Sequence, residues 1–173
     1  MKLAALALLG AFCWTFAEYV LHRFAGHGGR GRHALSREHL AHHARPEYFS
    51  PAWKKLLLAV PVLGALFGAL TPLASPAAAG ALTAGFDAGW LAYEALHRAL
   101  HVWPPRHAYG RWARRHHFAH HFQQPKANHG VTTPLWDVVF RTHQPVAVVR
   151  VPRKLAPQLP WLERVTTGEF VVV

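Results

Sequence analysis

Histidine is concentrated in two stretches of the chain, and both stretches repeat one spacing. Each begins with Leu-His-Arg, adds a second histidine about one helical turn later and ends in H-x-x-H-H. On a helix, positions i, i+3 and i+4 share a face, so imidazoles at this spacing converge. Neutral imidazole is the commonest side-chain ligand for transition metals. The pattern predicts ten metal ligands: His22, His27, His39, His42, His43, His97, His101, His117, His120 and His121.

One position in the second stretch is ambiguous. His116 and His120 are also four residues apart, so His116 is a rival to His117. We prefer His117, because it reproduces the H-x-x-H-H spacing of the first stretch.

A doubled set of five imidazoles suggests ten ligands shared between two metal ions. Structural zinc takes four ligands, and copper and nickel sites are also satisfied by fewer than five. Five nitrogens leave one octahedral position open, which suits iron that binds and activates dioxygen. We therefore expect two iron ions, with zinc as an alternative occupant in purified protein, because imidazole sites accept zinc readily.

Several further polar residues are candidates to orient the imidazoles from behind. Carboxylates near the two stretches in the sequence are Glu18, Asp87, Glu94 and Asp137. His129 lies in an Asn-His-Gly turn, where it is either a structural turn residue or a residue that contacts a metal ligand or the substrate. No catalytic residue beyond the metal ligands is indicated.

Long apolar stretches must position these histidines. Residues 56 to 86 carry no charge. At about 1.5 Å per residue, these 31 residues would span roughly 46 Å as one helix, more than the bilayer core of about 30 Å. A helical hairpin that turns at residues 71–76 is therefore expected. With an apolar stretch near the N-terminus, the sequence predicts an all-α integral membrane protein with spans near 3–21, 56–73 and 77–96, and a cytoplasmic helical cap around a dinuclear site.

The first apolar stretch has two interpretations, a signal peptide or a membrane helix. Lys2 and Ala17 could supply the basic start and cleavage site of a signal peptide. However, 18 of the 19 Lys and Arg residues follow His22, and basic residues stay on the cytoplasmic side. A retained helix is favoured, and three spans then place every histidine on one side. We expect a bacterial inner-membrane protein with cytoplasmic histidine clusters, one domain over residues 1–143 and a cytoplasmic tail over residues 144–173 without chemistry of its own.

The charge balance, 19 Lys and Arg against 8 Asp and Glu, raises the question of a nucleic-acid partner. No matching fold signal accompanies the charge, so anionic lipid headgroups are the better explanation. A single cysteine, Cys13, excludes an internal disulfide framework and a cysteine-based metal site. The oligomeric state is not indicated.

The ten-histidine pattern, together with Asn128 and the Gly-Val-Thr-Thr-Pro-Leu-Trp-Asp run at residues 130–137, resembles the fatty acid hydroxylase/sterol desaturase superfamily over roughly residues 14 to 142. The resemblance implies a membrane di-iron oxygenase that uses the same ten histidines as ligands. Members of that superfamily act on lipid-embedded substrates with dioxygen and two electrons. The chain departs from the larger members of that superfamily in having no fused cytochrome domain, so we expect its electrons to come from a separate donor, a ferredoxin or a b-type cytochrome.

Three functions remain open. The leading hypothesis is hydroxylation of a fatty-acyl or related lipid. A carotenoid or sterol-type hydroxylase or desaturase is a second, and a non-catalytic membrane protein that binds zinc or nickel is a third. Aromatic residues near the second stretch could line an entrance for the lipid chain or simply anchor the protein at the interface: Trp112, Phe118, Phe122, Trp136 and Phe140.

Overall fold

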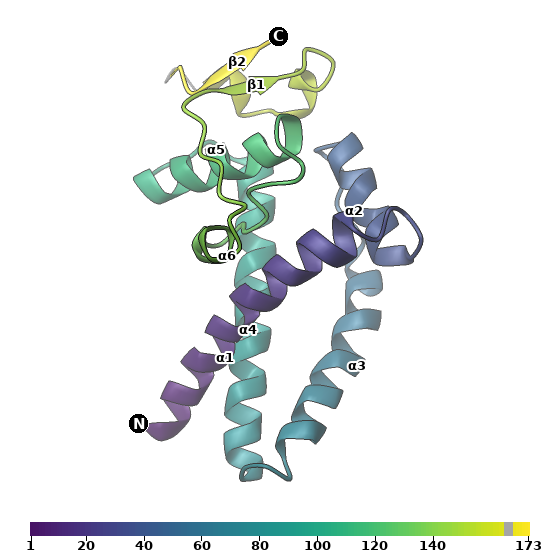
Figure 1. The fold of residues 1–173 in the computed structure, drawn as a ribbon, viewed down its shortest axis with the longest axis vertical. Helices are drawn as coiled ribbons and strands as arrows, with labels where there is room; N and C mark the ends of the chain where they lie inside the picture. Colours follow the sequence, from purple (N-terminus) through teal and green to yellow (C-terminus); the bar gives the residue numbers. More distant parts are fainter. Residues whose placement is uncertain (165–167) are drawn as a thin grey trace. The chain divides into compact units, whose positions relative to one another are not determined.

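The chain folds mostly as helices in a computed structural model that describes residues 1–164 and 168–173 (Figure 1). In chain order the helices are α1 (Lys2–Val20), the π-helix η1 (Leu21–His27), α2 (Ala34–Ala44), α3 (Ala52–Leu70), α4 (Pro76–Val102), α5 (Ala108–Phe122) and α6 (Leu135–Val139). Two short strands, β1 (Val149–Val151) and β2 (Phe170–Val172), and the 3-10 turns η2 (Ala156–Gln158) and η3 (Leu162–Arg164) follow.

Residues 1–17 and 50–94 form one compact unit, which contains most of α1, all of α3 and most of α4. The expected hairpin is present, with α3 ending at Leu70 and α4 beginning at Pro76. Proline suits this position, because its fixed φ and missing N–H are tolerated in the first helical turn. Within the unit, α1 and α4 approach closely, since a Cβ added at Gly85 would lie 1.8 Å from the carbonyl oxygen of Ala7. Small residues of this kind let membrane helices pack backbone to backbone.

Two helical stretches in the described part of the chain are long and apolar enough to cross a membrane, by length and composition: Lys2–His27 and Ala52–Leu70. No residue of α3 is buried. The third expected span, residues 77–96, lies within α4 and stays a prediction.

Residues 18–49 and 95–173 form the second compact unit, and all ten predicted ligands lie in it. Its first helix is η1, where the amide of Gly28 donates to the carbonyl of Arg23 at 3.0 Å, five residues back. An α-helix would turn about 100° per residue and set His22 and His27 about 140° apart. The wider π-helix brings residues five apart close to the same face, and π-helical turns are frequent at functional sites.

Two further ligand-bearing helices of this unit, α2 and α5, begin alike. His33 precedes α2 and its Nδ1 accepts a hydrogen bond from the amide of Ser36 at 3.3 Å. His107 precedes α5 and accepts from the amide of Gly110 at 3.1 Å. Each side chain satisfies one of the amides that a helix start leaves unpaired.

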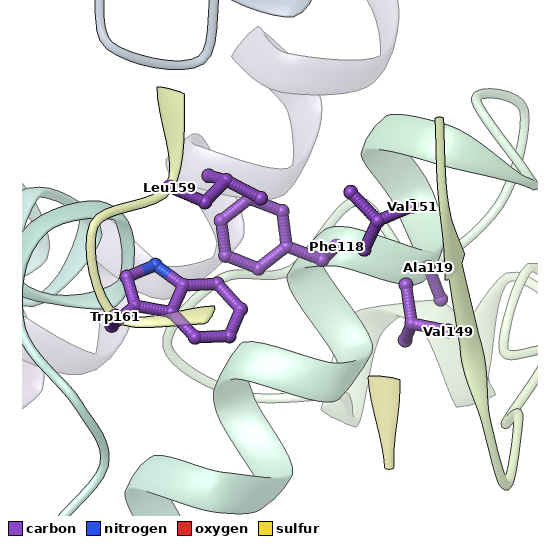
Figure 2. Packing of buried hydrophobic residues seen from close by; sticks show 6 residues of the cluster. All are labelled: Phe118, Ala119, Val149, Val151, Leu159 and Trp161. Carbon is purple, nitrogen blue, oxygen red and sulfur yellow. The ribbon is translucent and has the colours of Figure 1, made fainter. Parts of the chain in front are cut away.

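The expectation of an all-helical chain is wrong at the C-terminus. There β1 and β2 form a parallel pair, with Val149 opposite Phe170 and Val151 opposite Val172. Val149 and Val151 are buried while Arg150 between them is exposed, the alternation of a strand with one buried face. The β-branched valines favour this conformation. Figure 2 shows the buried face against α5.

Candidate metal centre

The ring nitrogens of the ten predicted ligands gather into two groups. In each group, one nitrogen per residue lies within 4.8 Å of every other. Group A consists of His22, His27, His39, His43 and His120, and group B of His42, His97, His101, His117 and His121. The expected convergence of ten imidazoles therefore takes the form of two five-nitrogen clusters that could each hold a metal ion.

The two groups do not coincide with the two sequence stretches. Each stretch contributes four histidines to one group and one histidine to the other. His39 and His43 are four residues apart and lie about 40° from each other around α2, whereas His42 lies about 100° from His43. His42 consequently points in another direction and contributes its nitrogen to group B. His120, the equivalent residue of α5, differs from His117 and His121 in the same way and contributes its nitrogen to group A.

Within the groups, the Nε2 atoms face one another. The Nε2 atom of His120 lies 2.9 Å from those of His22 and His27 and 3.2 Å from that of His43. In group B, the Nε2 atoms of His97 and His42 are 3.0 Å apart, and those of His101 and His117 are 2.9 Å apart.

Backbone carbonyls determine which ring nitrogen carries the proton in three of these histidines. The Nδ1 atom of His22 donates to the carbonyl of His129 at 2.5 Å, and that of His120 donates to the carbonyl of Ala127 at 2.7 Å. In group B, Nδ1 of His42 donates to the carbonyl of Tyr48 at 2.7 Å. A carbonyl only accepts, so the proton is on Nδ1 and a lone pair is left on Nε2.

Two such lone pairs, on His22 and His120, then face each other at 2.9 Å. Protonation does not relieve the repulsion, because burial, followed by the charges of His22 and His43, lowers the pKa of His120 well below its ordinary value. A cation between the rings does. Metal–nitrogen bonds of about 2.0–2.1 Å put neighbouring ligands of an octahedron about 2.9 Å apart, close to the separations found here. The donor set fits a metal ion.

The buried imidazoles make the metal-free protein sensitive to acid. Burial lowers the pKa values of His39, His117, His120 and His121 well below the ordinary value of 6.5. Below about pH 6.5 the unfolded chain therefore binds more protons than the folded one, and the free energy of unfolding falls. We expect the thermal midpoint of metal-free protein to drop between about pH 7.5 and 5.5, measured by circular dichroism. A flat profile would contradict the neutral burial of these rings.

Two buried carboxylates hold the turn that supports group A. Asp137 accepts from the amides of His129 and Gly130, both at 2.8 Å. Glu18 accepts from the amide of Thr132 at 3.0 Å and from its hydroxyl at 2.6 Å. A Cβ at Gly130 would lie 2.1 Å from the carbonyl oxygen of Thr133, so the turn requires glycine there. Glu18 and Asp137 act on the backbone of the turn, whose His129 carbonyl orients His22.

Asp137 is ionised despite its burial. Burial alone would raise its pKa, but hydrogen bonds from His116, His129, Gly130 and Thr142 outweigh burial and hold the pKa well below its ordinary range. The Nε2 atom of His116 lies 3.4 Å from the Asp137 carboxylate. His116 thus faces Asp137, whereas His117 contributes its nitrogen to group B.

Other candidates lie elsewhere. Glu94 forms an ion pair with Lys55. Phe118, a candidate for the lipid entrance, is fully buried in the core against the C-terminal strands.

Phe49 is a neighbour of group B that the sequence did not reveal, with its ring centroid 5.2 Å from His42 and 5.5 Å from His101. Its place between two prolines indicated only a loop.

Comparisons with known proteins show which family this chain resembles. The family model described as fatty acid hydroxylase matches residues 7–142. A dihydroceramide fatty acyl 2-hydroxylase of Arabidopsis thaliana is 30% identical over 163 residues, covering 88% of this chain and 65% of the plant protein. The fatty acid 2-hydroxylase of Mus musculus is 33% identical over 145 residues, covering 79% of this chain and 39% of the mouse protein.

A solved structure of full-length scs7p, in which only the hydroxylase domain is visible, superimposes with a TM-score of 0.67 at 28% identity. The likeness covers 82% of this chain and 56% of that one. The chain thus spans less than two thirds of the length of these relatives. The resemblance to the fatty acid hydroxylase/sterol desaturase superfamily is confirmed. Since the matched residues 7–142 include all ten converging histidines, the chain belongs to the fatty acid hydroxylase family.

Proposed function

We propose that this protein is a membrane-bound di-iron oxygenase that hydroxylates a fatty-acyl chain. The observation that carries the proposal is the pair of five-imidazole groups, in one of which the lone pairs of His22 and His120 face each other at 2.9 Å. The names of the relatives support the substrate class, and we take the carbon next to the acyl carbonyl as the site of attack, as in proteins named 2-hydroxylases.

Groups A and B would each hold one iron ion. When bound, the two ions supply the activation of dioxygen and the oxidation of an unactivated C–H bond. In the balanced reaction, one oxygen atom enters the lipid as a hydroxyl group. The other leaves as water, after uptake of two electrons and two protons.

The chain's own residues would bind the metal ions and orient the imidazoles. His42 and His120 tie the two halves of the centre together, because each belongs to one helix and serves the group of the other. Carbonyls of residues 127 and 129 keep Nε2 of His120 and His22 unprotonated and aimed inward. Ordering ligands from behind in this way raises their basicity and their affinity for metal. The rings of Phe49 and Phe118 lie 5.5 Å and 4.8 Å from that of His101 and give group B apolar neighbours.

A membrane location follows from the same proposal. The helices Lys2–His27 and Ala52–Leu70 are apolar enough to span a bilayer, and the acyl substrate is itself a membrane lipid. We place the histidines on the cytoplasmic side of a bacterial inner membrane, with residues 77–96 as a third span, because the basic residues accompany them. A separate ferredoxin or b-type cytochrome would deliver the electrons there.

Lipid mass spectrometry of an expressing host grown under labelled dioxygen tests the proposal. We expect 2-hydroxylated acyl chains that carry one labelled oxygen, and none in cells that express a variant with His39 and His43 replaced by alanine. Turnover by metal-free protein, or label taken from water, would contradict the oxygenase. New hydroxylated carotenoids or sterols instead of acyl chains would favour the second hypothesis. Readily exchanging zinc or nickel without redox change would favour the third.

A further inference from the structure

Groups A and B differ in how some of their rings are supported, although His42 of group B, like His22 and His120 of group A, donates to a backbone carbonyl. In group A, the rings of His22 and His120 are held by hydrogen bonds to carbonyls of one turn. In group B, the Nδ1 atom of His117 and both ring nitrogens of His121 are buried and have no hydrogen-bond partner in the described part of the chain. These two rings pack instead against Phe118, with centroids 5.6 Å and 5.7 Å away. The rings of His117 and His121 in group B therefore depend on packing for their geometry.

Phe118 is held in turn by the C-terminal segment, which we define as residues 144–164 and 168–173. Figure 2 shows the Phe118 ring between Leu159, Trp161 and Val151. The Phe118 and Trp161 rings are 5.2 Å apart, and both are fully buried. Arg115 of α5 adds an ion pair with Glu169 at 2.6 Å. The C-terminal segment thus holds the Phe118 ring, which contacts the group B ligands His117 and His121.

The C-terminal segment is also linked to α4, a second helix that carries ligands of group B. The guanidinium of Arg114 lies 4.3 Å from the centre of the Trp161 ring. It donates to the carbonyls of Leu100 at 2.9 Å and Ala99 at 3.2 Å, in the turn of α4 that ends at His101. Trp161 is therefore linked to α5 through Phe118 and to α4 through Arg114.

A surface cavity of about 300 Å³ is lined both by the ligand His101 and by Pro157, Gln158 and Pro160 of the C-terminal segment. A cavity of this size admits water and small solutes. The C-terminal segment and one ligand of group B therefore share the wall of one cavity.

We propose that Trp161 and the C-terminal segment position group B specifically, so that the two metal ions of the centre differ in how fast they exchange. Trp161 is a positioning residue, since it acts through Phe118 and Arg114. The family match ends at Thr142, so this support lies outside the residues that the match covers. The inference rests on the proposed metal centre.

Zinc release to a chelator tests this inference in single-group backgrounds. Replacing His39 and His43 with alanine leaves group B intact, and replacing His97 and His101 leaves group A intact. In each background, zinc-loaded protein with and without Trp161→Leu is exposed to EDTA, and retained zinc is measured by elemental mass spectrometry over time. Trp161→Leu should speed release from group B by about tenfold or more and change release from group A by less than about twofold.

Two controls sharpen the comparison. Trp161→Phe keeps an aromatic ring beside Phe118 and Arg114 and should restore slow release from group B. Trp53→Leu, at a tryptophan that is 60% exposed, should change neither rate. Equal acceleration in both groups, or none in group B, overturns the inference alone. A wild-type chain that retains no zinc or iron overturns the proposed function as well.

Discussion

We expect alanine in place of His42 to release the metal ion proposed for group B, although His42 belongs to the first histidine stretch. The reason is its direction on α2, which takes its Nε2 atom to within 3.0 Å of that of His97. His120→Ala should release the ion of group A in the same way, because its Nε2 atom is 2.9 Å from that of His22. We expect each single variant to retain one metal ion in place of two after dialysis against a chelator, and to lose hydroxylation.

Double variants identify which ion is lost. His42→Ala combined with His97→Ala should still lose only one ion, because both residues belong to group B. His42→Ala combined with His39→Ala should lose both ions, although the two residues are neighbours on α2. His33→Ala, at the helix cap outside both groups, serves as the matched control and should keep two ions. The reverse result for the two doubles would disprove the exchange of ligands between the stretches.

Replacing Asp137 with asparagine should weaken group A through the turn behind it. The carboxylate accepts hydrogen bonds from the amides of His129 and Gly130 and from the hydroxyl of Thr142. An amide side chain of the same size cannot accept all of these, and each buried donor left unpaired costs about 1–3 kcal/mol. The His129 carbonyl that orients His22 then loses its support. Loss of such an outer partner typically lowers metal affinity by about 10–100-fold.

Metal titration in the single-group backgrounds measures this effect. Asp137→Asn should reduce zinc affinity in the background that retains group A and leave the affinity of group B nearly unchanged. Glu163→Gln, at an exposed carboxylate, is the matched control and should affect neither group. Equal weakening of both groups would show that Asp137 stabilises the unit as a whole and does not act on His22.

The two sets of variants probe opposite sides of the centre. Asp137 and the turn support group A by hydrogen bonds, whereas Trp161 and the C-terminal segment support group B by packing. If both behave as expected, the two ions have separate supports despite their similar ligands. The residues of the C-terminal segment, in which the sequence indicated no chemistry, then matter for only one ion.

The sequence by itself determined the histidines that converge and the helices that carry them. The H-x-x-H-H spacing places imidazoles on one side of a helix whatever surrounds it, because the helical repeat is a local property. The hairpin turn at residues 71–75 could likewise be predicted, since prolines and a long uncharged run are local features. The choice of His117 over His116 also followed from spacing alone.

Only the tertiary structure decided how the ten imidazoles divide and what holds them. The spacing predicts the direction of His42 on its own helix. It does not predict which helix faces His42, because that depends on the packing of distant segments. The partners of His22 and His120 are backbone carbonyls, which every residue possesses and which therefore leave no signature in the sequence. The strands at the C-terminus could not be predicted either, because their pairing and their contact with Phe118 join residues far apart in the chain.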